Sequence, residues 1–155
     1  MDIQIVQAKP EDVSEILDLQ KLAYRKEAVL YHDWNIPPLT QTLHEIQAEF
    51  ETSVFLKVDQ ADRIIGSVRA LLDSGTCKIG RLIVHPEYQK RGIGSLLLKT
   101  IEAYFPEAQR FELFTGTKSG DNIRLYQKLG YKEFRQQDLS QKVRIVFLEK
   151  RCPAP

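Results

Sequence analysis

Gly92 and Gly94 stand at the point where an apolar strand gives way to a strong helix, within the sequence LIVHPEYQKRGIGS of residues 82–95. The first turn of a helix leaves about four backbone N–H groups without partners and carries the positive end of the helix dipole. Glycine lets an anion approach these groups closely, and the glutamine, lysine and arginine before it add further donors. The turn Gln89–Ser95 therefore has the chemistry of a phosphate-binding site.

Two better-known glycine patterns do not fit this turn. A P-loop needs Gly-Lys-Ser/Thr four residues after its first glycine, and the dinucleotide fingerprint needs a further glycine at a different spacing. No acidic metal-binding motif accompanies the turn, which disfavours an enzyme that transfers nucleotide phosphates. A pair of glycines near a helix start is common, so the turn alone is weak evidence.

A second segment adds specificity. The pattern LxVxP followed by QxxGxG, in residues 82–94, resembles the pyrophosphate-binding motif of the GNAT superfamily of acyl-CoA N-acyltransferases. The sequence NIRLYQKLGY of residues 122–131 is similar to the same family's LYxKxGF helix, at the expected distance downstream. The order of elements agrees as well, so the resemblance covers residues 2–150.

The resemblance implies an N-acetyltransferase that moves the acetyl group of acetyl-CoA, or a close acyl-CoA, directly to a primary amine. It implies that the strand Leu82–Val84 splays from Phe111–Thr115 to admit the pantetheine arm, and that a backbone N–H near Val84 faces the thioester oxygen. Either Ser119 or Asn122 would make a polar contact to the pantetheine or order a water molecule. The residues assigned to donor binding are Leu82, Ile83, Val84, Gln89, Lys90, Arg91, Gly92, Ile93, Gly94, Ser95, Ser119 and Asn122.

Tyr126 matches the family's general-acid tyrosine. Coenzyme A leaves as a thiolate, and a thiol pKa of about 8.5 means that a nearby phenol can usefully supply a proton. The competing interpretation of Tyr126 is a core aromatic beside Leu125 and Leu129 on an apolar helix face. The motif favours the acid.

The general base stays open. An acceptor amine with a pKa of about 10.4 must lose a proton before it attacks. The family often places a glutamate where this sequence has Phe114. The alternatives are a water relay or one of four carboxylates elsewhere, Glu112, Glu49, Glu45 and Asp33.

The acceptor is a small-molecule or peptide amine whose identity the sequence does not specify. Tyr31 and Trp34, in a loop with Pro37 and Pro38, are candidates for one wall of its pocket, or they simply pack the loop. The histidines lack metal-ligand spacing, so no metal is expected. A rival function is a non-catalytic acyl-CoA-binding sensor or regulatory module of the same fold.

Both strands and helices are expected to position these residues. Alternating or β-rich segments predict strands over residues 3–7, 53–58, 64–72, 77–84, 111–115, 131–134 and 143–148. Helical spacing predicts helices from Pro10 to about residue 30, near 43–50, over 92–104 and over 122–129. The fold class is therefore α+β, a mixed, largely antiparallel twisted sheet flanked by helices in the order β-α-α-β-β-β-α-β-α-β-β.

Length, composition and net charge limit the kinds of partner that we expect for the protein. The 155 residues suit a single N-acetyltransferase domain over 1–155, with 43% hydrophobic and 28% charged residues. A net charge of +1 argues against nucleic acid or a membrane surface as the main partner. No apolar run is long enough to span a bilayer, and the N-terminus lacks signal-peptide character, so we expect a cytoplasmic protein.

The remaining expectations concern the cysteines and the assembly state. Cys77 and Cys152 are expected to stay reduced, with Cys152 in a frayed tail, Arg151–Pro155. Edge strands near the C-terminus are compatible with a homodimer.

Overall fold

A seven-stranded sheet in the order β1-β2-β3-β4-β5-β7-β6 organises the chain in the computed structural model, which describes residues 3–152. Every neighbouring pair of strands is antiparallel except β4 and β5, which are parallel. The predicted α+β class with a largely antiparallel sheet is confirmed. The strands are β1 (Gln4–Gln7), β2 (Val54–Gln60), β3 (Arg63–Asp73), β4 (Thr76–Val84), β5 (Arg110–Gly116), β6 (Lys132–Asp138) and β7 (Arg144–Arg151).

The helices between β1 and β2 are more numerous than predicted. The first predicted helix divides at Tyr24 into α1 and α2, and a short helix begins where Pro37 supplies a suitable first position. The side chain of Tyr24 lies near Arg81 of β4 and interacts with its positive charge. The helices are α1 (Val13–Ala23), α2 (Arg25–Tyr31), α3 (Pro37–Thr40), α4 (Leu43–Thr52), α5 (Ile93–Ala103) and α6 (Gly120–Lys128).

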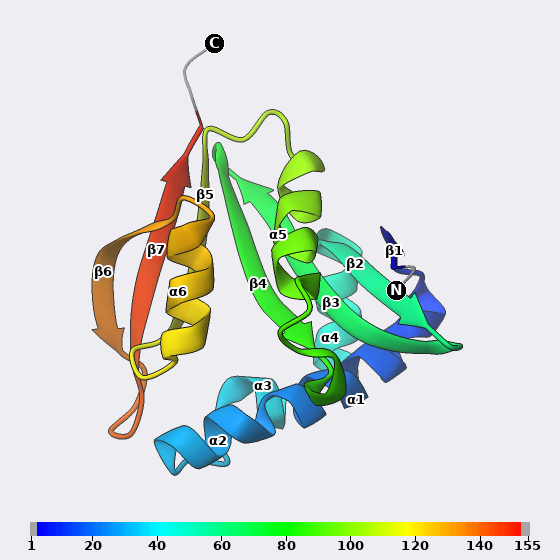
Figure 1. Ribbon diagram of the computed structural model, residues 1–155, viewed down its shortest axis with the longest axis horizontal. Helices are drawn as coiled ribbons and strands as arrows, with labels where there is room; N and C mark the ends of the chain where they lie inside the picture. Colours follow the sequence, from blue (N-terminus) through cyan, green and yellow to red (C-terminus); the bar gives the residue numbers. More distant parts are fainter. Residues whose placement is uncertain (1–2, 153–155) are drawn as a thin grey trace.

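Helices cover both faces of the sheet (Figure 1). On one face, the fully buried Leu97, Leu98 and Ile101 of α5 pack into the main apolar core, which Tyr126 of α6 also joins. On the other face, α1 and α4 pack a second core in which Ile16 and Ile46 are fully buried. These residues recur at helical spacing, which is why amphipathic sequence segments became helices that lie on a sheet.

The sheet opens between β4 and β5. The two strands pair only from Thr76 to Lys78 and from Arg110 to Glu112. Beyond that point they diverge, while β4 stays paired with β3 and β5 with β7 (Figure 1). The predicted splay of Leu82–Val84 from β5 is confirmed. It leaves backbone groups of two neighbouring strands facing a gap instead of each other.

The predicted fraying of the C-terminus is wrong for Cys152. Its backbone N–H donates to the Gln109 carbonyl oxygen at 3.0 Å, and its partly buried side chain packs against the main core. Both Cys77 and Cys152 are free thiols. Residues 153–155 of the predicted tail lie outside the described residues. Within 3–152, no helix is both long and apolar enough to cross a bilayer.

Candidate active site

A cavity of about 920 Å³ occupies the opening between β4 and β5. Its walls come from α1, α2, the diverging ends of β4 and β5, the turn before α5, and α6. Each end of this cavity has a different character. At one end, the turn Gln89–Ser95, called the glycine turn below, offers mainly backbone groups. At the other, called the acceptor end, five polar side chains gather: Tyr24, Glu27, Tyr31, Arg81 and Ser119.

The glycine turn is shaped by two residues in the left-handed region. Lys90 has φ 62° and Gly92 has φ 83°, a conformation that glycine adopts without steric cost. Gly92 is the N-cap of α5, and no side chain caps that helix. A Cβ at Gly92 would meet nothing within 4 Å, and one at Gly94 would lie 3.5 Å from Leu125. Gly92, Gly94 and Ser95 line the cavity, so the start of α5 borders a space large enough for an anion.

Most residues assigned to donor binding line this one cavity. They are Leu82, Ile83, Val84, Gln89, Lys90, Gly92, Gly94, Ser95, Ser119 and Asn122. Ile93 instead packs in the main core, only 1% exposed. The guanidinium of Arg91 lies over the ring of Tyr88, 5.2 Å from its centroid. Gln89 uses its side-chain amide to donate to the Val84 carbonyl at 3.2 Å, which joins the turn to the end of β4.

Tyr126 also lines the cavity, and its ring belongs to the main core. The side chain is 6% exposed, and its ring centroid lies 6.3 Å from that of Tyr131. Burial raises the pKa of Tyr126 well above its usual value, and the nearby Tyr24 and Glu27 raise it further. The phenol therefore stays protonated throughout the neutral range and can act only as a donor of a proton or hydrogen bond there.

A chain of hydrogen bonds holds the acceptor end together. The Lys118 backbone N–H donates to the Tyr31 hydroxyl at 3.0 Å, and that hydroxyl lies 2.7 Å from Ser119 Oγ. Ser119 Oγ in turn donates to Glu27 Oε2 at 2.6 Å. The hydroxyl of Ser119, predicted to contact the donor or a water molecule, thus already has two protein partners. Asn122, the alternative, donates from Nδ2 to Thr115 Oγ1 at 3.2 Å.

Gly116, the last residue of β5, makes this chain possible. A Cβ at Gly116 would lie 1.8 Å from the Tyr31 hydroxyl oxygen, far inside van der Waals contact. Only a residue without a side chain lets the phenol of α2 reach the loop that follows β5. Tyr31 is 5% exposed, so its hydroxyl has little room to move elsewhere. The sequence gave no indication of this approach, because 85 residues separate the two positions.

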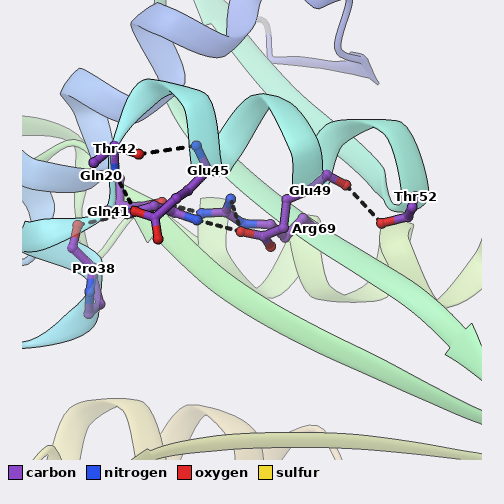
Figure 2. A network of polar contacts seen from close by, with 8 residues as sticks. All are labelled: Gln20, Pro38, Gln41, Thr42, Glu45, Glu49, Thr52 and Arg69. Carbon is purple, nitrogen blue, oxygen red and sulfur yellow. Dashed lines mark hydrogen bonds and ion pairs between the residues drawn. The ribbon is translucent and has the colours of Figure 1, made fainter.

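The carboxylates considered for the base lie elsewhere. Glu45 bonds the backbone and hydroxyl of Thr42 in a capping box, and Glu49 turns toward Arg69 (Figure 2). Neither lines the cavity. Both therefore stabilise α4 and its attachment to the sheet rather than reach a reacting group.

The other two carboxylates have similar local roles. Glu112 is at the paired end of β5 and forms an ion pair with Arg110 at 3.0 Å. Asp33 accepts from the Asn35 backbone N–H at 2.9 Å. Among residues 3–152, no group of three or more His, Cys, Asp and Glu side chains is arranged to hold a metal ion.

Glu27, which sequence reasoning missed, is instead the carboxylate at the acceptor end. A signal was present, because Tyr24, Glu27 and Tyr31 are three and four residues apart and so share one helical face. The other carboxylate of the cavity wall is Asp121, an exposed residue that pairs with Lys26 and Arg124. Of the two aromatic candidates for the acceptor wall, Tyr31 lines the cavity, whereas Trp34 does not and is 58% exposed.

Comparison with known sequences gives one family and one curated relative. Residues 13–131 match the model of the acetyltransferase (GNAT) family. The UPF0157 protein YqkA of Bacillus subtilis (strain 168) is 29% identical over 132 residues, which is 84% of this chain. The chain spans only 38% of the length of that relative.

Solved structures with the same fold include complexes with coenzyme A. The PaiA N-acetyltransferase of Thermoplasma acidophilum, solved with coenzyme A, aligns with a TM-score of 0.79 and 19% identity over 98% of this chain and 100% of its own. YncA of Salmonella typhimurium, described as a putative acetyltransferase with acetyl-CoA, aligns with a TM-score of 0.75 and 20% identity over 100% and 98%. These similarities show the fold.

Proposed function

Because the chain belongs to the GNAT acetyltransferase family, we propose that it transfers the acetyl group of acetyl-CoA to a primary amine. Overall, the amine nitrogen bonds to the acetyl carbon, the carbon–sulfur bond breaks, one proton leaves the amine and one joins the sulfur. Coenzyme A and acetyl-CoA in the structures of two similar proteins support the same donor here.

One observation carries the proposal: a single cavity joins the glycine turn to Tyr126. The glycine turn suits the pyrophosphate, because the start of α5 lines the cavity and no side chain caps the helix. Cations also outnumber carboxylates on the cavity wall, which favours a ligand with several phosphates. Apart from Arg81, which lies in the bulge of β4, the cations are Lys26, Lys90, Lys118, Arg124 and Lys128, and the carboxylates are Glu27 and Asp121.

The stretch of β4 that is not paired with β5 suits the acyl end of the donor. Leu82 and Val84 line the cavity beyond the last residue of β4 that pairs with β5. Their backbone groups can bond an extended ligand as a neighbouring strand would. A backbone N–H in this stretch that faces the thioester oxygen would stabilise the negative charge that develops there during attack.

In this proposal, one side chain donates a proton and another accepts one. Tyr126, kept protonated by burial, supplies a proton or hydrogen bond to the leaving sulfur. Glu27 accepts the proton of the attacking amine, directly or through water, and Ser119 fixes one of its carboxylate oxygens. Both residues line the same cavity, and the negative charge of Glu27 raises the pKa of Tyr126.

Two measurements test the proposal. Calorimetry with coenzyme A measures binding, and a thiol assay measures its release from acetyl-CoA in the presence of a library of primary amines. We expect binding together with amine-dependent release. Absence of binding would refute the proposal. Binding without amine-dependent release would instead support the non-catalytic acyl-CoA-binding module.

A further inference from the structure

Arg81 occupies a bulge of β4 beside the cavity. Arg69 of β3 pairs with Gly80 and Ser67 pairs with Ile83, so two residues of β4 face the single residue between them on β3. Arg81 has φ 49°, a left-handed conformation that is uncommon for residues other than glycine, asparagine and aspartate. Bulges re-aim side chains and are frequent beside functional sites. This one directs a guanidinium to the acceptor end.

The guanidinium of Arg81 is incompletely satisfied. It interacts electrostatically with the Tyr24 hydroxyl, and its Nε is buried and has no hydrogen-bond partner. Within residues 3–152, no carboxylate forms an ion pair with it. A buried donor without a partner is costly, and an anion bound to the part of this side chain that lines the cavity would offset its positive charge.

A second buried guanidinium adds positive charge near Arg81. Arg69 is 4% exposed, and its carboxylate partner is Glu49, at 3.3 Å (Figure 2). Burial lowers the pKa of Arg69 to about 10, and the positive charge of Arg81 acts in the same direction against Glu49. Of these two neighbouring arginines, only Arg69 forms an ion pair within residues 3–152, so the charge of Arg81 is not neutralised by direct contact. An anion beside Arg81 would balance this charge.

We infer that Arg81 binds a carboxylate of the acceptor, so that the acceptor is an amine that also carries a carboxylate, as amino acids do. The inference rests on the proposed function and names its substrate class. A guanidinium matches a carboxylate in two parallel hydrogen bonds. Glu27, the carboxylate of the acceptor end, and Arg81 both act on the hydroxyl of Tyr24. An amino group and a carboxylate on one small molecule are complementary to that pair of charges.

The phosphates of the donor do not account for this arginine. The glycine turn begins beyond the end of β4, and three residues of strand from Arg81 to Val84 span roughly 10 Å. A pyrophosphate held at the start of α5 therefore lies well away from the bulge. The acceptor is the substrate that reaches it.

The experiment compares matched acceptors. The probes are neutral L-amino acids, β-alanine and 4-aminobutyrate, each beside its carboxamide, with the release of coenzyme A from acetyl-CoA followed for both. We expect the best acid to exceed its amide at least tenfold in kcat/KM. The intrinsic trend is opposite, because loss of the carboxylate makes the amine less basic and leaves more of it unprotonated at neutral pH.

Arg81→Asn is the decisive variant. Asparagine tolerates the left-handed conformation, so this change removes the guanidinium and keeps the bulge. We expect the preference for acid over amide to vanish through a rise in KM for the acid, whereas Arg81→Lys keeps part of it. Arg144→Gln is the control, because this exposed arginine pairs with Asp138 away from the cavity. It should leave the preference intact.

A binding measurement separates this inference from the proposed function. The thermal shift caused by each acid and amide is recorded with coenzyme A present, which needs no turnover. We expect acids to stabilise the wild-type protein more than amides and to lose this advantage in Arg81→Asn. Equal effects of acid and amide, or a preference that survives in Arg81→Asn, would overturn the role of Arg81 even if other amines are acetylated. Failure to bind coenzyme A or to acetylate any amine would refute the proposed function alone.

Discussion

The glycine turn and the acceptor end belong to the same cavity but are built in opposite ways. The glycine turn is seven consecutive residues, and what it offers is mainly the backbone at the start of α5. The acceptor end consists of side chains from α2 and its junction with α1, from a bulge of β4, and from the loop before α6. In the proposed function, the donor is therefore recognised by local backbone geometry, whereas the choice of acceptor depends on long-range packing.

The largest effect is expected where the acceptor end is packed most tightly. Gly116→Ala places a methyl group where the Tyr31 hydroxyl lies, 1.8 Å from its oxygen. We expect a loss of about 3 kcal/mol in the free energy of unfolding, the upper range for overpacking, because the buried side chain of Tyr31 has little room to move. Chemical denaturation measures it.

The control is Gly80→Ala, at a glycine of β4 where a Cβ meets nothing within 4 Å. It should unfold at the same denaturant concentration as the parent, or a higher one. If Gly116→Ala were equally tolerated, the Tyr31–Ser119–Glu27 chain would not be a rigid part of the site.

The next effect concerns the glycine turn. Gly94→Asp adds a negative charge beside the first N–H groups of α5, where we place the pyrophosphate. Because like charges in close proximity cost several kcal/mol, we expect coenzyme A affinity to fall about a hundredfold. Calorimetry measures the change, and Gly92→Asp should act in the same direction.

Two milder variants help to separate the contributions to the loss of coenzyme A affinity. Gly94→Ala adds only a Cβ at 3.5 Å from Leu125, so it separates the charge from the bulk of the side chain. Arg91→Ala should cost only a few-fold, because the backbone donors remain. Unchanged affinity in Gly94→Asp would show that the glycine turn is not the phosphate site.

A smaller effect is expected at Tyr126, between the two regions. Tyr126→Phe keeps the ring in the core and deletes the hydroxyl. General acid catalysis typically contributes about 10²–10⁴-fold, and we expect kcat to fall at least roughly tenfold with little change in coenzyme A affinity or melting temperature. Steady-state kinetics beside a thermal melt measure both.

Tyr131→Phe is the matched control. Tyr131 is a buried neighbour whose hydroxyl donates to Glu102 Oε2 at 2.7 Å and does not line the cavity. Its loss should lower stability and spare the rate of the folded enzyme. Full activity in a well-folded Tyr126→Phe protein would remove Tyr126 from the mechanism and leave it a core aromatic.

The smallest effect is expected outside both regions, at Cys152. This residue packs against the main core at the sheet's far end, so Cys152→Ser exchanges a partly buried thiol for a hydroxyl. We expect a change below about 1 kcal/mol in stability and none in turnover. Mass measurement without reducing agent should show both thiols, and a mass two daltons lower would contradict the free cysteines.

What the sequence could predict also differs between local features and features that depend on long-range packing. The helix α5 was predictable, because its buried residues recur at helical spacing and a clear start signal precedes them. Strand β6 was predicted only to Phe134, yet it continues to Asp138. All of its residues are exposed, so no alternation of polar and apolar residues marks the extension. Pairing with β7 alone makes it a strand.

The sequence by itself determined the glycine turn, the placement of Tyr126 on a helix after β5, and the family. Each of these depends on residues that are neighbours along the chain, whose spacing fixes their local geometry. Only the tertiary structure decided which carboxylate and which arginine lie at the acceptor end of the cavity. Glu27, Arg81 and Ser119 are separated by dozens of residues, and the bulge in β4 and the bare backbone at Gly116 bring them together. The convergence of side chains from separate elements depends on register and packing, which no local pattern records.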